Sequence, residues 1–192
     1  ERNLSAEIST KEIKFLGEGR EAIVVIDCGV KLNIIRSLTE RGYRVALVPW
    51  DTDVTKLNFE FHAVIISSGP GDPTKVVTTI QNVKKIITKK IPIFGICLGN
   101  QILALASGGT TYKLKFGHHG ANHPVKDLVN NKIGITSQNH GFCVDIQSLK
   151  KDDVEITHVN LNDQTLEGLR HKKYPLYSVQ YHPEAAPGPH DS

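Results

Sequence analysis

The stretch Pro92-Ile93-Phe94-Gly95-Ile96-Cys97-Leu98-Gly99-Asn100-Gln101 joins a short apolar run to an amphipathic one. The apolar run up to Ile96 predicts a buried strand, and the apolar stripe that begins at Leu98 predicts a helix directly after it. Glycines on both sides of Cys97 permit the close backbone approach that a sharp strand-to-helix turn requires. The sequence therefore predicts a nucleophile elbow with Cys97 at its tip.

Cys97 is a candidate nucleophile because of this position. The positive end of a helix favours a thiolate over a thiol, and the thiolate is the reactive form, so we expect the Cys97 sulfur to be ionised. The alternative is a buried structural cysteine, which is common for free cysteines, but the flanking glycines favour the nucleophile. Cys28 and Cys143 adjoin apolar strands without such a turn, and we interpret both as structural.

A candidate base lies far downstream, in the run Gln180-Tyr181-His182-Pro183-Glu184. His182 follows a predicted strand, and Glu184 is close enough in sequence to fix the tautomer of its ring. A His-Pro-Glu triplet alone is weak evidence, because turns often contain these residues. A cysteine activated by a histidine that a carboxylate orients is the triad of acyl transfer. The combination with Cys97 therefore predicts this chemistry.

The chain outside the elbow repeats the alternation of buried strands and amphipathic helices. Strands are predicted at 22–27, 44–49, 63–68 and 93–96, with helices after the first, third and fourth of them. This alternation predicts an α/β fold with a mostly parallel, doubly wound central sheet flanked by helices. Shorter segments predict additional antiparallel strands at 111–115, 132–138, 142–146, 154–160, 166–170 and 176–181.

Composition limits the other function classes. The 192 residues, 39% of them hydrophobic, suffice for one globular domain, which we place at residues 21–192. The net charge of +3 comes without a dense basic block, which argues against nucleic acid as a partner. Three cysteines without C-x-x-C spacing favour a reducing compartment, the cytoplasm. No apolar stretch reaches the roughly 18 residues of a membrane span.

The loop Ser67-Ser68-Gly69-Pro70-Gly71-Asp72-Pro73 follows a predicted strand, and its glycines leave backbone N–H groups open to a ligand. If this loop faces Cys97, the N–H groups of Gly69 and Leu98 can stabilise the oxyanion of a tetrahedral intermediate. A plain turn is the alternative. Phosphate binding is disfavoured, because the Lys-Ser/Thr pair of a P-loop is missing.

Two further polar segments are candidates for ligand binding. The run Gly117-His118-His119-Gly120-Ala121-Asn122-His123-Pro124 contains three imidazoles, but a loop broken by glycines lacks the defined scaffold of a zinc site, and we expect no metal. Thr136-Ser137-Gln138-Asn139-His140-Gly141-Phe142 is the better candidate. Backbone groups around Asn139 and Gly141 are placed to bind the charged end of an amino acid, unless this segment is an ordinary corner between two strands.

Together the elbow, the Gly69-Pro70-Gly71-Asp72-Pro73 loop and His182-Pro183-Glu184 resemble the class I (triad) glutamine amidotransferases. Five further motifs are similar to the glutaminase domain of carbamoyl-phosphate synthetase, namely Asp27-Cys28-Gly29-Val30-Lys31, Val48-Pro49-Trp50, Phe116-Gly117-His118-His119-Gly120, Ser137-Gln138-Asn139-His140-Gly141-Phe142 and Pro187-Gly188-Pro189-His190-Asp191. The resemblance covers residues 22–192 and implies a flavodoxin-like mixed sheet.

This resemblance implies hydrolysis of L-glutamine to glutamate and ammonia, without a cofactor in this domain. Cys97 would form a glutamyl thioester, His182 would transfer the proton, and Glu184 would orient His182. The residues that match family positions around the oxyanion and the substrate are Gly69, Gly71, Leu98, Gln101, Asn139, Gly141 and Phe142.

The resemblance also implies partners. The family's ammonia passes to a large synthetase subunit or fused synthetase domain, which uses ATP and Mg to make carbamoyl phosphate for pyrimidine or arginine biosynthesis. An N-terminal domain contributes a serine to the glutamine site, and residues 1–20, which lack a sustained period, are interpreted as a linker or tail from that missing domain. Asn100 replaces a histidine found in many members, and we expect a small effect.

Two alternatives stay open at the level of sequence. One is another class I amidotransferase, of the GMP or anthranilate synthesis type, which the stretches 116–120 and 187–191 disfavour. The other is a catalytically weak regulatory or interaction domain of a synthetase, since some relatives of this kind have lost the nucleophile. Cys97 and His182 are both present here, which favours the enzyme.

Overall fold

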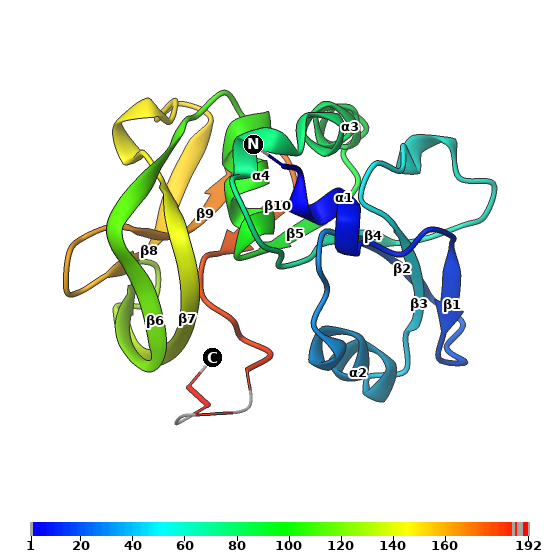
Figure 1. The fold of residues 1–192 in the computed structure, drawn as a ribbon, viewed down its shortest axis with the longest axis horizontal. Coiled ribbons are helices and arrows are strands. Elements are labelled where there is room, and N and C mark those ends of the chain that lie inside the picture. Colours follow the sequence, from blue (N-terminus) through cyan, green and yellow to red (C-terminus); the bar gives the residue numbers. More distant parts are fainter. Residues whose placement is uncertain (1, 186, 188–189, 192) are drawn as a thin grey trace.

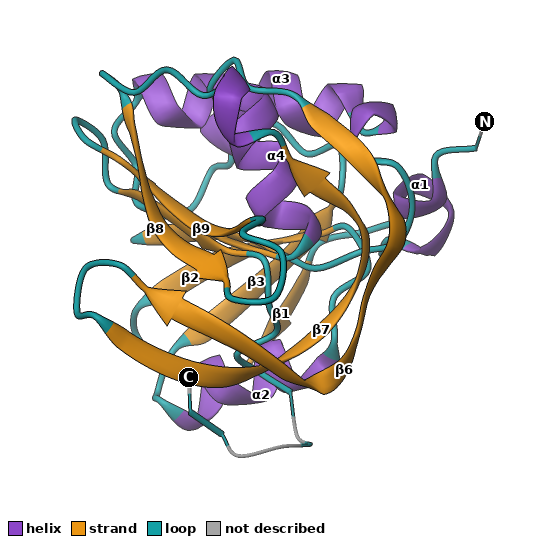
Figure 2. Cartoon of the chain, turned by 90° about the vertical axis from the view of Figure 1, so that its left-hand side faces the viewer, coloured by secondary structure: helices purple, strands orange, loops and turns teal. Residues whose placement is uncertain are grey.

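Ten strands form one sheet, in the order β1-β3-β2-β4-β5-β10-β9-β8-β6-β7, with helices on both faces (Figures 1 and 2). This computed structural model describes residues 2–185, 187 and 190–191, so Gly188 and Pro189 of the motif at 187–191 lie outside the described residues. The strands are β1 (Lys14–Leu16), β2 (Ala22–Asp27), β3 (Arg44–Pro49), β4 (Ala63–Ile66), β5 (Ile93–Ile96), β6 (Thr111–Asp127), β7 (Lys132–Val144), β8 (Val154–Asn160), β9 (Leu166–His171) and β10 (Leu176–Val179). The helices are α1 (Leu4–Ile8), α2 (Leu32–Glu40), α3 (Val77–Thr88) and α4 (Leu98–Ala106), and short 3-10 turns lie at Val54–Lys56, Pro73–Lys75 and Ile146–Ser148.

The central part of the sheet is parallel. Strands β3, β2, β4, β5 and β10 pair side by side in the same direction, which is the flavodoxin-like order. Every residue of β2 is buried, because the strand is covered on both faces. Val24 and Ile26 pack in the core with α3 and α4, whereas Ile23 and Val25 pack in the core with α2. The predicted α/β class and its mostly parallel centre are confirmed.

Strands β9, β8, β6 and β7 are antiparallel to their neighbours, as predicted, whereas β10, predicted as an antiparallel addition at 176–181, pairs in parallel with β5 and antiparallel only with β9. Two of the antiparallel strands are longer than predicted. β6 and β7 form a continuous curved hairpin, where the sequence suggested short strands separated by loops (Figure 2). Register shifts between Lys113 and His118 and between Gly120 and His123 let the ribbon bend without ending. Gly117 and Gly120 adopt positive φ there, so these glycines bend the strand and do not break it. The supposed histidine loop and strand corner are therefore both parts of strands.

The first twenty residues contain regular structure, contrary to the prediction. Helix α1 begins after Asn3, whose side chain accepts a hydrogen bond from the N–H of Ala6, and β1 pairs antiparallel with β3. The backbone N–H of Thr10 also donates to Asp27 at the end of β2. Elements of five and three residues are too short to show a period in the sequence. The origin of this segment in an upstream domain stays a prediction.

The site lies at one edge of the sheet. Because β2, β4, β5 and β10 are parallel neighbours, the segments that follow Asp27, Ile66, Ile96 and Val179 all emerge at the same edge. None of the helices in the described part of the chain is long and apolar enough to cross a membrane.

Candidate active site

Cys97 occupies the predicted elbow. β5 ends at Ile96, α4 begins at Leu98, and Cys97 between them has φ 54° and ψ −102°, a conformation that non-glycine residues rarely adopt. Its backbone N–H donates to the carbonyl of Val179 on β10 at 2.9 Å. Gly99 is required at this turn, because a Cβ there would lie 2.2 Å from the carbonyl oxygen of Ile66. The strand-to-helix turn is thus confirmed in geometry, and Cys97 lines a cavity beside it.

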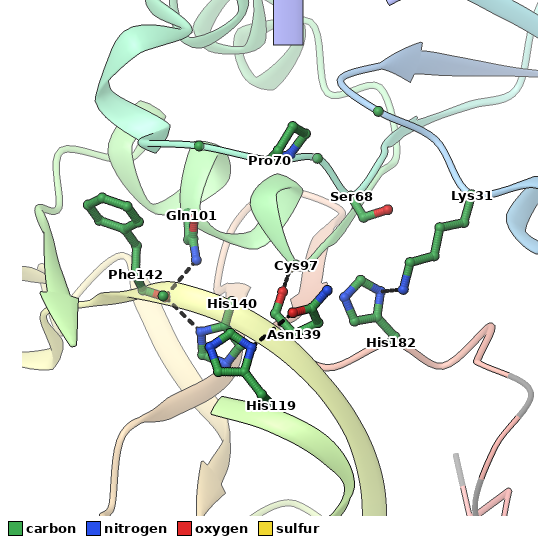
Figure 3. Close-up of a pocket in the computed structure, with 14 residues that line it drawn as sticks. Lys31, Ser68, Pro70, Cys97, Gln101, His119, Asn139, His140, Phe142 and His182 are labelled. Atoms are coloured by element: carbon green, nitrogen blue, oxygen red, sulfur yellow. Dashed lines mark hydrogen bonds between the residues drawn. The ribbon is translucent and has the colours of Figure 1, made fainter. Parts of the chain in front are cut away.

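His182 reaches the same cavity through β10. This strand runs parallel to β5, with Val179 opposite Ile96, so the residues that follow the two strands are neighbours. The backbone N–H of His182 donates to the carbonyl of Ser137 at 2.9 Å, which anchors the turn to β7. Cys97 and His182 both line one cavity of about 350 Å³ (Figure 3). The structure therefore brings together the two residues on which the predicted chemistry depends.

The ring of His182 is oriented by Glu184. Its Nδ1 lies 2.8 Å from Glu184 Oε1, and both side chains are buried. Nδ1–H donation to this carboxylate leaves Nε2 with the lone pair that a base requires. Burial alone would favour the neutral acid, but the hydrogen bond and charge of His182 outweigh it and lower the pKa of Glu184. Glu184 is therefore an ionised partner that can stabilise an imidazolium.

Six of the seven predicted substrate residues line the cavity, and they come from both sides of it. They are Gly69, Gly71, Gln101, Asn139, Gly141 and Phe142. Gln101 donates through Nε2 to the carbonyl of Phe142 at 2.8 Å, which ties α4 to β7 (Figure 3). The same Nε2 also donates to Gln180 Oε1 at 3.1 Å. Asn139 accepts through its side chain at 2.9 Å from His119 Nδ1. Asn139, Gly141 and Phe142 lie within β7, so a strand and not a corner forms their side of the cavity.

Leu98 is the predicted site residue that does not line the cavity with its side chain, which is buried in the core. Its backbone N–H hydrogen-bonds to Cys97 and lowers the pKa of that thiol. A Cβ on Gly69 would lie 2.8 Å from Leu98 Cδ2 and 2.1 Å from the carbonyl oxygen of Cys28, so only glycine fits at this contact. The loop that carries Gly69 thus packs against the elbow, as a shared oxyanion site requires.

Six residues of the cavity were not proposed from the sequence as site residues, namely Gly29, Lys31, Ser68, Pro70, His119 and His140. Lys31 Nζ lies 3.2 Å from His182 Nδ1 and 3.8 Å from Glu184 Oε1. The signal for Lys31 was its place just after the first parallel strand, at the edge where such sites form. Ser68 Oγ is buried and has no hydrogen-bond partner within the described residues, so it is free to bind a substrate.

The protonation of Cys97 differs from the prediction. Burial raises the pKa of the thiol to about 12, and the charge of Lys31 and the N–H of Leu98 only partly counteract it. The expectation that the helix end holds this sulfur ionised is therefore wrong for this structure. Desolvation of a fully covered sulfur outweighs one helix end, because the charged form loses its water. Cys97 rests as a thiol, and attack requires a base.

His118, His119 and His123, which are close in sequence, do not face one common site. His119 faces the cavity, whereas the ring of His118 packs against those of His123 and His140. Burial lowers the pKa of His140 to about 4, so its ring is neutral near pH 7. The sequence did not indicate that His140, from β7, joins His118 from β6.

We expect Lys31→Met to slow alkylation of Cys97 by iodoacetamide several-fold at pH 8. The lysine charge lowers the pKa of Cys97, so its loss leaves less thiolate. The rate is measured by mass spectrometry of the peptide that contains Cys97. Lys56→Met, at a 3-10 turn after β3, is the control and should alkylate like the parent chain. Equal rates for all three proteins would exclude an electrostatic role for Lys31.

Comparison with known proteins places this geometry in context. The family model described as glutamine amidotransferase class-I matches residues 24–192. A carbamoyl phosphate synthase small chain from Methanocaldococcus jannaschii is 55% identical over 188 residues, which cover 96% of this chain and 52% of that protein. One from Fusobacterium nucleatum is 50% identical over 192 residues, covering 99% and 53% respectively. The chain thus spans about half the length of the curated relatives it matches.

Solved structures share the fold. A protein from Thermoplasma acidophilum, described as part of a putative GMP synthase, superposes with a TM-score of 0.74 at 26% identity, over 88% of this chain and 86% of that one. A glutamine amidotransferase from Thermotoga maritima superposes with a TM-score of 0.68 at 20% identity, over 87% and 77%. The second similarity concerns the fold alone.

Proposed function

We propose that this chain, which belongs to the glutamine amidotransferase class I family, hydrolyses the side-chain amide of L-glutamine to glutamate and ammonia. The observation that carries the proposal is the meeting of Cys97, on its elbow, with His182 at one cavity, where Glu184 orients the imidazole. These are the three members of a cysteine-based acyl-transfer triad.

The reaction follows from the protonation states. His182 Nε2 takes the proton of the Cys97 thiol as the sulfur attacks the amide carbon, and the carbonyl oxygen becomes an oxyanion. The imidazolium, stabilised by Glu184, then gives the proton to the leaving nitrogen, and ammonia departs from a glutamyl thioester. Water, deprotonated by His182, hydrolyses the thioester and restores the thiol. Each step uses side chains of this chain, and none needs a cofactor.

The backbone of the elbow and of the Gly69 loop supplies the oxyanion site. The N–H of Leu98 already points to Cys97, and the Gly69 backbone packs against Leu98. A donor of this kind typically contributes about 2.7 to 4 kcal/mol to lowering the barrier.

Substrate binding uses the opposite wall. The β7 backbone from Asn139 to Gly141, held by the bond of Gln101 to Phe142, is suited to the charged end of glutamine. Gly71, with φ +93°, and the Ser68 hydroxyl, which has no hydrogen-bond partner in the described part of the chain, lie on the facing loop and complete this binding site.

The ammonia is proposed to serve carbamoyl phosphate synthesis, for pyrimidine or arginine production. The curated relatives are named as small chains of carbamoyl phosphate synthase, which supports a large subunit or fused synthetase domain as the partner, with ATP and Mg bound there. The part of the curated relatives that this chain does not span is proposed to complete the glutamine site. The three cysteines are free thiols, which supports the reducing cytoplasm as the compartment.

One observation supports the alternative of an amidotransferase that serves GMP synthesis. It is the structural match to a protein described as part of a putative GMP synthase. Its identity of 26% is half that of the carbamoyl phosphate synthase relatives, which reach 50% and 55%. The carbamoyl phosphate assignment is therefore favoured.

The experiment combines the 192-residue chain with the large subunit of a related synthetase, bicarbonate and ATP. We expect glutamine to be converted to glutamate, and its amide nitrogen, labelled with ¹⁵N, to appear in carbamoyl phosphate by mass spectrometry. The chain alone should release glutamate more slowly, because partner binding commonly orders such sites. Free ammonium chloride is the positive control for the synthetase. Incorporation from ammonium but not from glutamine would contradict the proposed partner.

A further inference from the structure

A second group of chemically active side chains lies buried beside the cavity, outside the triad, and one of its members, His140, also lines the cavity. It consists of His118 on β6, His140 on β7 and Glu167 on β9, and one potential ligand atom of each lies within 4.8 Å of the others. Their exposed fractions are 7%, 6% and 0%. His118 and His140 are opposite one another in the β6–β7 ladder, which brings their ring centroids to 4.9 Å. Tertiary pairing thus assembles the group from three strands.

Glu167 is a buried acidic side chain that faces the His118 imidazole, and this contact is the largest of the causes that raise the pKa of that ring. Its carboxylate accepts from Gln138 Nε2 and from Asn160 Nδ2, both at 2.8 Å. Within the described part of the chain, the only ion pair recorded for it is with His118 Nδ1 at 3.7 Å, beyond hydrogen-bond distance. An imidazolium at 3.7 Å, without a hydrogen bond, offsets only part of the desolvation cost of a buried carboxylate, which is on the order of several kcal/mol. A positive charge at this point would remove that cost.

The two imidazoles direct lone pairs toward the same region. His118 Nε2 lies 2.8 Å from Asp163 Oδ2, and the opposite nitrogen, Nδ1, is buried without a hydrogen-bond partner among the residues that the structure describes. In the neutral ring that donates to Asp163, this Nδ1 carries a lone pair on the side of Glu167.

His140 has the complementary arrangement. Its Nδ1 lies 2.8 Å from the carbonyl oxygen of Phe142, and its Nε2 lies 3.0 Å from Gln138 Oε1. The amide of Gln138 is oriented by donation from its Nε2 to Glu167 and to Thr136. A neutral imidazole carries one N–H, so one of its two contacts sets a lone pair against an oxygen. A cation between His140 Nε2 and Gln138 Oε1 would turn this repulsion into two bonds.

We propose that His118 Nδ1, His140 Nε2 and a carboxylate oxygen of Glu167 bind one divalent transition metal of the zinc class, with Gln138 Oε1 as a fourth donor. Two imidazoles with oxygen donors form a set that zinc accepts in tetrahedral geometry. Asp163 and the Phe142 carbonyl hold the remaining ring nitrogens, as the outer partners of metal-bound histidines commonly do. The metal links β6, β7 and β9 behind the wall that Asn139 and Phe142 contribute to the cavity. Its role is structural, because no ligand belongs to the triad.

This site differs from the metal site that the sequence suggested and that we did not expect, which would have used His118, His119 and His123. His119 faces the catalytic cavity, so the three histidines that are close together in the sequence do not form the ligand set. The ligands that complete it come from strands far along the chain, His140 on β7 and Glu167 on β9.

The test measures metal binding directly and needs no turnover, so its outcome is independent of the proposed function. Cys97→Ser serves as the parent, because the catalytic thiol would otherwise compete for the metal. The protein is stripped with EDTA and titrated with Co²⁺ and with Zn²⁺, by absorption and by calorimetry. We expect one equivalent to bind, with the visible bands of tetrahedral Co²⁺ and without a thiolate charge-transfer band. Addition of Zn²⁺ should displace the cobalt.

Variants then identify the ligands. His118→Gln and Glu167→Gln should abolish the stoichiometric binding. Asp163→Asn, which leaves the ligands in place but loosens the His118 ring, should weaken affinity by about 10 to 100-fold. The matched control is His62→Gln, an exposed imidazole that follows no site strand, and it should bind like the parent. Far-UV circular dichroism establishes that each variant is folded.

Three outcomes would overturn the proposal. They are the absence of stoichiometric binding by the folded parent, unchanged binding by folded His118→Gln, and a thiolate charge-transfer band that assigns the metal to Cys28 or Cys143. The first would mean that a proton shared within the group compensates Glu167. If Glu167→Gln fails to fold, the parent's cobalt spectrum and the half-exposed Asp163→Asn variant still decide the question.

Discussion

Cys97→Ser is expected to reduce glutamate release from glutamine by at least about 10³-fold, the scale on which loss of a triad nucleophile acts. Oxygen is close in size to sulfur, so the elbow and the cavity should keep their shape. The hydroxyl, however, is a much weaker acid than the thiol, and His182 cannot prepare it for attack on an amide. The measurement is coupled detection of glutamate for the parent and the variant at equal concentration.

The matched control for this experiment is Cys143→Ser. Cys143 Sγ lies 3.7 Å from the carbonyl oxygen of Val144 and 3.8 Å from that of Leu166, so a hydroxyl there has acceptors to bind. Activity should remain within a few-fold of the parent chain. Acid quenching during turnover, followed by mass spectrometry, should find the glutamyl thioester on the peptide of Cys97. A thioester on Cys28 or Cys143 would refute the assignment of the nucleophile.

His182→Asn is expected to cause a loss of similar size, whereas Glu184→Gln should cost about one to two orders of magnitude less. Cys97 is a thiol with a pKa of about 12, so hydrolysis depends on a base to take its proton, and removal of His182 removes that base. Glutamine at 184 keeps a hydrogen-bonding group near Nδ1 but not the charge that stabilises the imidazolium. Both variants are compared with the parent in kcat and KM.

The kinetic pattern separates the roles of the two residues. Both substitutions should lower kcat more than they raise KM, because neither side chain is expected to bind glutamine in the ground state. His62→Asn replaces an exposed imidazole and should leave the rate unchanged. Full activity of His182→Asn would require a different base. An equal loss in both variants would mean that the carboxylate contributes as much as the imidazole, which contradicts a purely orienting role.

Much of the catalytic site could be predicted because its signals are local. The elbow around Cys97 is a strand, a tight turn and a helix that are consecutive in sequence, and the glycines that it requires occur within it. The loop with Gly69 also follows directly on a buried strand. The boundaries of β2, β3 and β5 agree with prediction, because runs of apolar residues covered on both faces are unambiguous.

Other features were not predictable from local patterns. The sequence predicted short strands in place of the β6–β7 hairpin, because glycines within a strand look like breaks. In the structure, pairing across the hairpin maintains each strand through two bulges. Lys31 was quoted only as part of a motif, because its contact with His182 depends on sheet order. The small effect expected for Asn100 stays a prediction, although the structure places its side chain in a buried network with Ser178 and Gln180.

The sequence by itself determined the fold class and the elbow and supplied the three candidate triad residues, because periodicity, glycine placement and residue chemistry act over a few neighbouring positions. Only the tertiary structure decided that His182 lies beside Cys97, since this requires β10 to pair in parallel with β5. It also decided that Cys97 rests as a thiol and that His118, His140 and Glu167 share one buried site. Ionisation and metal affinity depend on how completely distant segments exclude water and where they direct their polar atoms, and these are properties of packing.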